Sequence, residues 1–464
     1  SYLFDQVNNT DQNIVTDISG NVFANLEILK GLEFKPSVNY QLTSTKSNYF
    51  SPSTVYQSPA YNLASVTSSN AYSIQTDMLI NYTNTFNGIH NLNLLAGLTA
   101  SKYNSESVGA KGGEFALDLY EYHLLSSGIA TRMGVSSGLS ERSRIGYVGR
   151  INYDYKRKYY FTFNSRYDGA SIFGMNSKWG FFPSGALSWR LSEESFVKNL
   201  GVFEDLKIRT SYGITGSEGL SPYSSEAQLA VSTSGIMAGG RTVSYYPSSI
   251  EVPDLKWEET AMFDLGVDAS FFGGRLNIVA DYYQKKTKDL FLNLPLAMTS
   301  GVNSVTKNIG RTENKGFEFG ANVVISKGRF GWNADFNIST EKMKVNDLAG
   351  LPSVVVGTLN NIPVHIIKVG ESIGSFYGYK TDGIWQTDDL AGLTEIPKQK
   401  GINVQPGNIK FIDQNNDNDI TADDRTIIGN AFPKFYGGLN NTFTYKGFDA
   451  TCAINFVYGN DIFN

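Results

Sequence analysis

The residues whose types and spacing most clearly suggest a chemical role form an acidic run near the carboxyl end, from Asp413 to Asp424. Oxygen-bearing residues occupy positions 1, 3, 5, 7, 9 and 12 of this run, which is the spacing of a loop that wraps a calcium ion. The fourth ligand in this pattern contributes its backbone carbonyl, and the others contribute side chains. The candidate calcium ligands are Asp413, Asn415, Asp417, Asp419 and Asp424.

Two departures separate this acidic run from an EF-hand. Asn418 stands where the loop has its turn glycine, and Asp424 replaces the bidentate glutamate. The first departure is mild because asparagine tolerates a positive φ. No amphipathic helices flank the run, so the alternative is a polar turn held by Asx hydrogen bonds. Calcium is the one cofactor suggested by the sequence, and none is required.

Catalytic chemistry finds little support. The G-x-S-x-G pattern at 134–138 needs a strand–turn–helix elbow and a histidine partner to act as a nucleophile, whereas we expect it in a polar loop. His90, His123 and His365 are far apart, and Cys452 is the single cysteine. A disulfide framework, a zinc-thiolate site and a histidine metal cluster are therefore not expected. The sequence predicts a protein that is not an enzyme.

Aromatic residues in the long connections form a second set of candidates. Rings that lie beside polar side chains can stack on and hydrogen-bond to a sugar. The same rings can instead pack the loops onto one another. The candidates are Tyr245, Tyr246, Phe376, Tyr377, Tyr379 and Trp385.

The composition indicates a β-rich chain with an unusually apolar exterior. The 464 residues include 27 Tyr, 29 Phe and 46 Gly, and only 18% are charged, below the ~25% of ordinary soluble domains. No stretch approaches the ~20 apolar residues of a transmembrane helix. A net charge of −5 argues against a nucleic-acid partner. A transmembrane β-barrel and a soluble all-β protein both fit.

Two-residue alternation predicts the strands. In 263–271, five apolar residues alternate with Asp264, Gly266, Asp268 and Ser270, so one face is apolar and the other polar. We expect about fourteen such strands in all. Further alternating or paired segments are 145–155, 159–166, 183–191, 205–213, 276–283, 317–325, 330–339, 435–445 and 449–458.

Short turns alternate with long connections along the chain. The expected turns are Lys30-Gly31, Asn87-Gly88, Lys156–Lys158, Gly273-Gly274, Lys327-Gly328 and Lys446-Gly447. The expected long loops are 44–72, 101–142, 214–258, 287–314 and 341–433. A soluble sandwich would have similar connections at both ends, and a propeller would repeat every ~40–45 residues. The asymmetry is instead typical of outer-membrane barrels, which have periplasmic turns and extracellular loops.

Several ordered motifs go beyond barrel physics. They are Arg166–Ser171, Lys178–Gly185, Ser188–Arg190, Leu206–Gly213, Leu255–Glu258, Asp281–Tyr283, Thr287–Leu290, Asn314–Glu318, Gly378–Trp385, Gly407–Phe411 and Pro433–Gly438. In this order they closely resemble the SusC/RagA family of TonB-dependent outer-membrane transporters, over nearly the whole chain.

The resemblance implies a multi-pass protein of the bacterial outer membrane with long extracellular loops. Family members are 22-stranded, up-and-down antiparallel barrels that contain a plug domain. They pair with a SusD-like surface lipoprotein and import oligosaccharides or oligopeptides with energy from the TonB complex. We expect residues 1–464 to be a partial barrel domain, without the plug and the C-terminal strands. A passive porin and a surface adhesin are the alternative functions.

Overall fold

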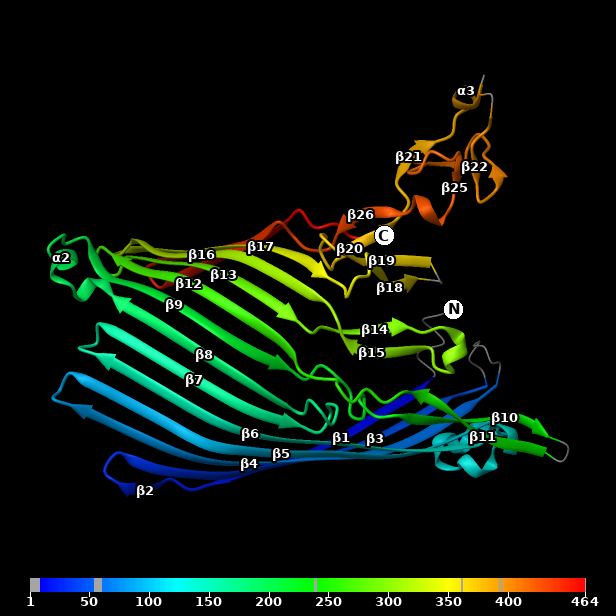
Figure 1. Ribbon diagram of the computed structural model, residues 1–464, viewed down its shortest axis with the longest axis horizontal. Helices are drawn as coiled ribbons and strands as arrows, with labels where there is room; N and C mark the ends of the chain where they lie inside the picture. The colour runs from blue at the N-terminus through cyan, green and yellow to red at the C-terminus, as the bar shows by residue number, and fades with distance from the viewer. Residues whose placement is uncertain are drawn as a thin grey trace.

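The computed structural model describes residues 9–53, 61–237, 240–359, 362–391, 393 and 395–463. One antiparallel sheet dominates it (Figure 1), in which fourteen strands follow one another in chain order. A short strand, β2 (Leu26–Leu29), continues the first of these along the same neighbour. The all-β barrel architecture expected from the sequence, with about fourteen strands, is therefore confirmed.

The fourteen strands that follow one another in chain order vary in length from 11 to 24 residues. In order they are β1 (Thr10–Phe23), β3 (Leu32–Ser51), β4 (Leu63–Phe86), β5 (His90–Gly113), β6 (Gly134–Tyr155), β7 (Tyr159–Ala170), β8 (Trp179–Arg190), β9 (Phe203–Ser217), β12 (Glu258–Phe271), β13 (Leu276–Lys288), β16 (Arg311–Ser326), β17 (Phe330–Asp347), β27 (Phe435–Tyr445) and β28 (Phe448–Tyr458). Within the described part of the chain, β1 and β28 do not pair with each other.

The short turns all lie at one end of the sheet, as predicted. Lys446 and Gly447 connect paired Tyr445 and Phe448, with φ of 46° and 87°, the positive values that a type I′ hairpin requires. The connection from β8 to β9 holds a single helical turn, α2 (Ser195–Lys198). These connections lie on the left in Figure 1.

The long connections lie at the opposite end and contain small sheets of their own. Two are hairpins, β10 (Gln228–Met237) with β11 (Gly240–Ser249) and β14 (Phe291–Pro295) with β15 (Ser304–Asn308). The longest, between β17 and β27, holds a four-stranded sheet of β18 (Ser353–Leu359), β19 (Ile362–Lys368), β20 (Ser375–Gly378) and β26 (Thr426–Asn430).

Beyond this four-stranded sheet the longest connection extends into a projecting module, residues 381–425 (Figure 1). Its elements are short. They are β21 (Thr381–Ile384), helix α3 (Thr387–Leu390), β22 (Lys398–Gln399), β23 (Ile402–Asn403), β24 (Ile409–Phe411), β25 (Asp419–Ile420) and the 3₁₀ turn η6 (Ala422–Asp424).

All five predicted loops were too long, because strands of the large sheet extend into each of them, and the excess is greatest in the first two. Residues 44–51 and 63–72 belong to β3 and β4, and residues 101–113 and 134–142 belong to β5 and β6. Hydrophobic alternation reports only the part of a strand with one apolar face. These strands continue past that part with polar residues on both faces, so their pairing leaves no trace in the hydropathy pattern.

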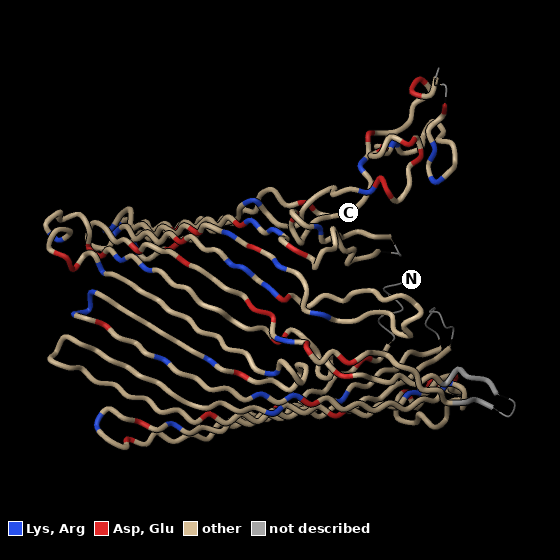
Figure 2. The backbone as a smooth tube through the Cα atoms, viewed as in Figure 1, with Lys and Arg blue, Asp and Glu red and all other residues tan. Residues whose placement is uncertain are grey.

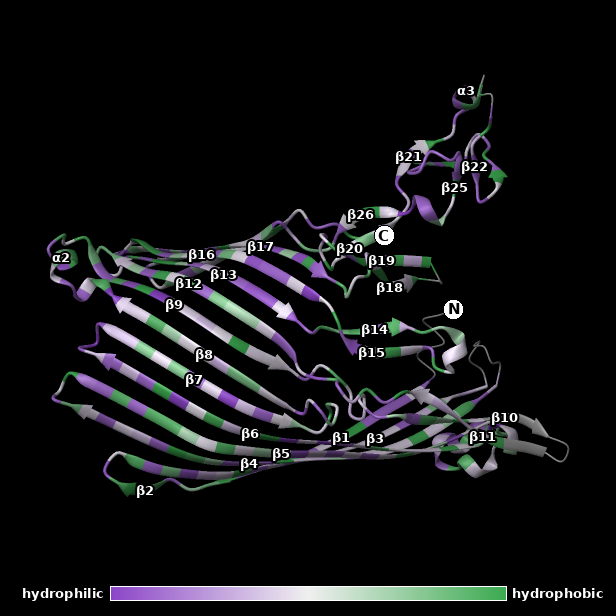
Figure 3. Cartoon of the chain, viewed as in Figure 1, coloured by the Kyte–Doolittle hydropathy of each residue, from purple (hydrophilic) through white to green (hydrophobic). Residues whose placement is uncertain are grey.

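Each strand has an apolar and a polar face, as Figure 3 shows by its alternating colours. On β12, Leu265 and Val267 are exposed on the apolar face, and Val267 pairs with Ile208 and Ala280 of the neighbouring strands. On the polar face, Asp264 and Asp268 both contact the guanidinium of one arginine. The apolar face fits lipid contact and the polar face fits a barrel lumen.

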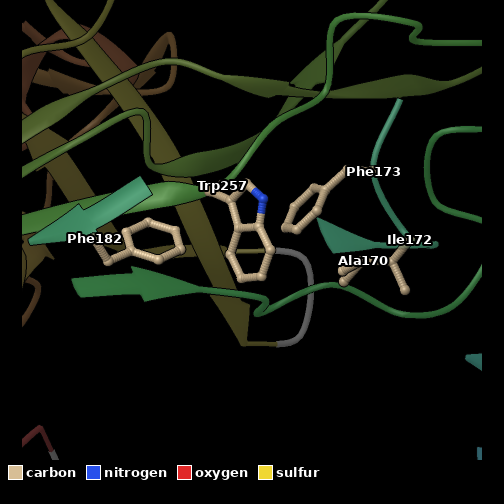
Figure 4. Packing of buried hydrophobic residues seen from close by; sticks show 5 residues of the cluster. All are labelled: Ala170, Ile172, Phe173, Phe182 and Trp257. Carbon is tan, nitrogen blue, oxygen red and sulfur yellow. The ribbon is translucent and has the colours of Figure 1, made fainter. Parts of the chain in front are cut away.

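A buried cluster joins the sheet to its long connections (Figure 4). Trp257, at the end of the β9–β12 connection, packs against Phe173 and Phe182 at ring distances of 4.6 and 5.2 Å. Its indole N–H donates to the carbonyl of Lys178 at 3.1 Å, and Ala170 and Ile172 complete the cluster. This packing explains the tryptophan of the Leu-Lys-Trp-Glu motif.

No helix of the described residues is long and apolar enough to cross a membrane.

The two faces lead to a stability prediction. Val267→Arg should place a charge against hydrocarbon and lower the free energy of unfolding by about 2–4 kcal/mol if the site lies near the bilayer midplane. Asp268→Asn should cost much less, because Arg209 keeps Asp264 and Asp281 as partners. Urea unfolding of the full-length protein in lipid vesicles measures both. A larger cost for Asp268→Asn would show that the faces are assigned the wrong way round.

The asymmetry of connections predicts sidedness. With the single, exposed Cys452 replaced by serine, a cysteine at Asp388 should react with a membrane-impermeant maleimide in intact cells. A cysteine at Arg157, in the short β6–β7 turn, should react only after the outer membrane is permeabilised. Labelling in the reverse order would invert the topology.

Candidate functional site

The acidic run folds into a compact turn between β24 and η6. The Asp413 carboxylate accepts hydrogen bonds from the backbone N–H groups of Asn416 and Asn418, at 2.6 and 2.7 Å. Asn418 has a φ of 68°, so it takes the left-handed conformation expected of the glycine that it replaces. The substitution is therefore compatible with the turn.

Asp424 closes the other end of the run. Its side chain is fully buried, and its two oxygens accept from the backbone N–H groups of Gln414 and Thr421 at 2.8 and 2.7 Å. Burial alone would raise the pKa of the Asp424 carboxyl, but these backbone hydrogen bonds outweigh burial and hold the pKa below its usual value. Asp424 is therefore a charged acceptor that fixes the turn.

The intervening residues follow the same pattern. Asn415 accepts from the N–H of Asp417 at 3.0 Å, and Asp417 accepts from the N–H of Asp419 at 2.8 Å. Asp419 turns away and accepts from the N–H of Gly401 at 3.0 Å. Among the described residues, no three His, Cys, Asp or Glu side chains are grouped as metal ligands. The geometry shows an Asx-rich turn, and calcium binding by it stays a prediction.

The aromatic candidates divide into buried and accessible rings. Phe376 on β20 is buried against His365 and Phe463, at ring distances of 5.2 and 5.8 Å. Tyr379 lies 5.3 Å from Phe411 by ring centroids and beneath the Arg425 guanidinium. Phe376 therefore packs the four-stranded sheet, where a cargo molecule has little access to its ring.

Trp385 lines a pocket of about 230 Å³ in the projecting module. The Lys410 ammonium lies 4.9 Å from the Trp385 ring centroid and 3.7 Å from an Asp382 oxygen. Asp413 and Asn418 of the acidic run also line this pocket. An aromatic face beside a cation and carboxylates can bind a polar ligand by stacking and hydrogen bonds.

The remaining candidates do not share this pocket. Tyr245 and Tyr246 are exposed on β11, and Tyr377 is half-buried on β20. The β10–β11 hairpin and the projecting module lie on opposite sides of the loop end in Figure 1. The aromatic candidates therefore belong to at least two separate surfaces.

The polar face carries charged clusters that sequence reasoning missed. Arg209 on β9 pairs with Asp281 on β13 at 2.6 Å, across the intervening strand β12. Gly266 is the register partner of both residues, and a Cβ there would overlap the carboxylate and the guanidinium. The glycine thus lets an ion pair span three strands. The two-residue alternation in the sequence places Gly266 on the polar face. Only the strand register shows that Arg209 and Asp281 lie on either side of it.

A second cluster lies on the polar face at β6 and β7. The Arg166 guanidinium binds both oxygens of buried Asp168, at 2.8 and 3.0 Å. Arg144 contacts Asp168 at 3.2 Å and Glu218 at 3.3 Å. Arg144 and Arg166 line a pocket of about 280 Å³ with Thr99, Ser101 and Gln75. The Arg-Tyr-Asp-Gly motif therefore holds charged groups on the polar face.

The G-x-S-x-G pattern was misplaced in a loop. Residues 134–138 begin strand β6 and pair with 107–111 of β5. No helix follows the serine, so the pattern lacks the strand–turn–helix elbow of a hydrolase nucleophile.

Comparison with known proteins identifies the family. A family model described as "TonB dependent receptor-like, beta-barrel" matches residues 3–448. TonB-dependent receptor P3 of Formosa agariphila is 34% identical over 453 residues, which cover 96% of this chain and 44% of the relative. TonB-dependent receptor SusC of Bacteroides thetaiotaomicron is 31% identical over 68% of this chain and 31% of the relative. The chain thus spans less than half the length of these curated relatives.

Solved structures support the fold. A chain of the RagAB peptide transporter matches with a TM-score of 0.82 and 22% identity, covering 98% of this chain and 49% of that chain. The RagAB peptide importer in its "open-open" state matches with a TM-score of 0.83, also at 22% identity. The predicted resemblance to SusC and RagA is confirmed. The chain belongs to the TonB-dependent receptor β-barrel family, a family of outer-membrane receptors and transporters rather than enzymes.

Proposed function

We propose that this chain forms part of the wall of an active outer-membrane importer of the SusC type. The observation that carries the proposal is the fourteen-stranded sheet itself, with an apolar face for lipid, a charged polar face and all long connections at one end. Such a wall suits a channel whose lumen is lined by polar groups and whose mouth is built from loops.

The proposal includes parts that lie outside these 464 residues. Backbone groups at a sheet edge cannot remain unpaired in hydrocarbon, and β1 and β28 each have one neighbour among the described residues. Further strands that complete a barrel of 22, as in the SusC/RagA family, would satisfy both edges. A plug domain that the TonB complex pulls from the periplasm would supply the gate and the energy coupling.

A SusD-like surface lipoprotein is the proposed partner at the loop end. The projecting module presents apolar side chains to solvent, including Ile384, Ile402 and Ile409. A lipoprotein that closes over the barrel mouth would cover such residues. The module stands away from the sheet in Figure 1, so it is accessible to a second protein.

The proposed cargo is an oligosaccharide or an oligopeptide. Trp385 with Lys410 and Asp382, and the exposed Tyr245 and Tyr246, provide stacking faces beside polar groups. Sugar rings and peptide side chains can both use such faces. The RagAB match bears the description of a peptide transporter, and the resemblance to the SusC/RagA family implies either class of cargo.

Energy dependence distinguishes an importer from its rivals. Cells that carry the full-length protein should accumulate labelled oligosaccharides or oligopeptides of the correct class, and a strain without the gene should not. A protonophore should abolish accumulation, because TonB coupling uses the proton gradient. Uptake that survives the protonophore would indicate a porin, and surface binding without uptake would indicate an adhesin.

We further propose that the Asp413–Asp424 turn binds calcium with low affinity. Its support is the ligand spacing and the left-handed Asn418. The shorter side chain of Asp424 predicts a dissociation constant weaker than about 10⁻⁵ M, the upper range of cytosolic sensors. At an extracellular surface, a site of this strength can still be filled.

Asp413→Ala should remove this calcium binding and leave barrel folding unchanged. Isothermal titration of the full-length protein with calcium measures the loss, and Asp388→Ala in helix α3 is a matched acidic control. Because the pKa of Asp424 is lowered, its stabilisation of the turn is full above the unfolded value of about 3.9 and is lost as pH falls through the folded value. If the heat of calcium binding is the same in the Asp413→Ala variant as in the wild type, the acidic run is a structural turn and not a calcium site.

A further inference from the structure

The apolar face changes character near the loop ends of β13, β16 and β17. Ala280 and Phe319 are register partners on this face, and Tyr282 and Phe317 form the next row. Beyond this row, most of the alternate residues are basic and exposed, and the exceptions include Gln284 and Glu313. This basic patch consists of Lys286, Lys288, Arg311, Lys315, Lys342 and Lys344.

The register sets cations directly against cations. Lys315 is the partner of Lys342, and Lys288 is the partner of Arg311. Like charges directly opposite each other in an antiparallel sheet are destabilising. The sheet therefore holds an unfavourable arrangement that an anion between the strands would relieve.

Nearby carboxylates do not neutralise the basic patch. Glu313 lies 3.2 Å from Lys315 and is the register partner of both Lys286 and Lys344. Glu259 lies 2.8 Å from Lys288, and Asp347 is the register partner of Arg311. Six cations thus face three carboxylates on this surface. Within the described part of the chain, Lys286, Lys342 and Lys344 make no ion pair of the kind that joins Lys315 to Glu313.

The excess of positive charge is local to these strands. At the loop-side ends of β5 and β6, on the same face, Lys102 pairs with Glu141 at 3.5 Å, and Lys46 on β3 stands two strands away. Figure 2 shows Lys and Arg gathered towards the loop ends of β13, β16 and β17. The patch is therefore a feature of one sector of the wall.

Its height matches the lipid headgroups. Lys315 lies two residues beyond Phe317, about 7 Å along the strand, and Lys342 lies beside it. Tyr282 and Phe317 form an aromatic row at the edge of the apolar band, where aromatic side chains mark the membrane interface. Cations one to three rows above such a row lie at the level of phosphate groups, clear of the hydrocarbon.

We propose that the basic patch binds the phosphate groups of an anionic glycolipid in the outer leaflet of the membrane. A phosphate oxygen accepts charge-assisted hydrogen bonds from several ammonium groups, and one phosphate between Lys315 and Lys342 would convert a repulsive pair into an attractive site. Acyl chains of the same lipid would lie along Phe317, Phe319 and Ile338 below. The binding fixes an annular lipid to one sector of the wall, independently of any cargo.

The test uses the full-length protein in a non-ionic detergent. Native mass spectrometry measures binding of lipid A that carries its phosphates, against the same lipid after dephosphorylation. Since each basic residue near an anionic surface adds to the attraction, Lys315→Gln with Lys342→Gln should weaken binding of phosphorylated lipid A by roughly tenfold or more. Binding of the dephosphorylated lipid should not change, and added salt should weaken only the phosphate-dependent part.

A matched control is the double variant Lys46→Gln with Lys102→Gln, which removes two cations from the same face on β3 and β5. It should keep wild-type binding. A heat-dependent shift in gel migration verifies that each variant is a folded barrel. Lys344→Gln alone is a milder variant, and it should lose less of the binding to phosphorylated lipid A. Equal losses in the control and the Lys315/Lys342 variant, or no preference for phosphorylated lipid, would overturn the proposal. Failure of cargo import would not affect this outcome.

Discussion

Backbone hydrogen bonding in a medium without water is the constraint on which the rest of this structure depends. A strand in hydrocarbon must pair with neighbours on both sides, because an unpaired N–H or C=O costs several kcal/mol there. The ladder from β1 to β28 meets this demand for every strand between its two ends, and among the described residues β1 and β28 each have one paired side. Short turns at one end keep successive strands adjacent, so the long connections all lie at the other end.

The ladder also decides which side chains meet. Period-two geometry places Val267 against lipid and Asp268 on the polar face, and the register then aligns Arg209, Gly266 and Asp281 in one row. Without a side chain at Gly266, the flanking charges reach each other. The same geometry sets Lys315 opposite Lys342 on the other face. On the polar face Arg209 meets its carboxylates within the sheet, whereas on the other face the Lys315 and Lys342 pair is where we propose a bound phosphate.

The connections at the loop end carry most of the candidate binding residues, and their backbone is not required to pair in a sheet as the strands of the wall are. Connections outside the membrane can bury their own clusters, such as Trp257 with Phe173, and form turns in which carboxylates replace backbone partners. Asp413 and Asp424 each accept two or more backbone N–H groups. The projecting module that holds them also holds the Trp385 pocket. The sites proposed here for cargo, cation and partner therefore all lie where hydrocarbon imposes no pairing rule.

The sequence by itself determined the fold class, the turns, the strand faces and the family, because alternation and glycine turns are local and the motifs are contiguous. It misjudged 101–113 and 134–142, where the paired strands continue with polar residues on both faces. Only the tertiary structure decided that Phe376 is buried, that the aromatic candidates lie apart, and that Arg209 meets Asp281. These contacts join residues far apart in the chain through strand register, and no local pattern of residues encodes that register.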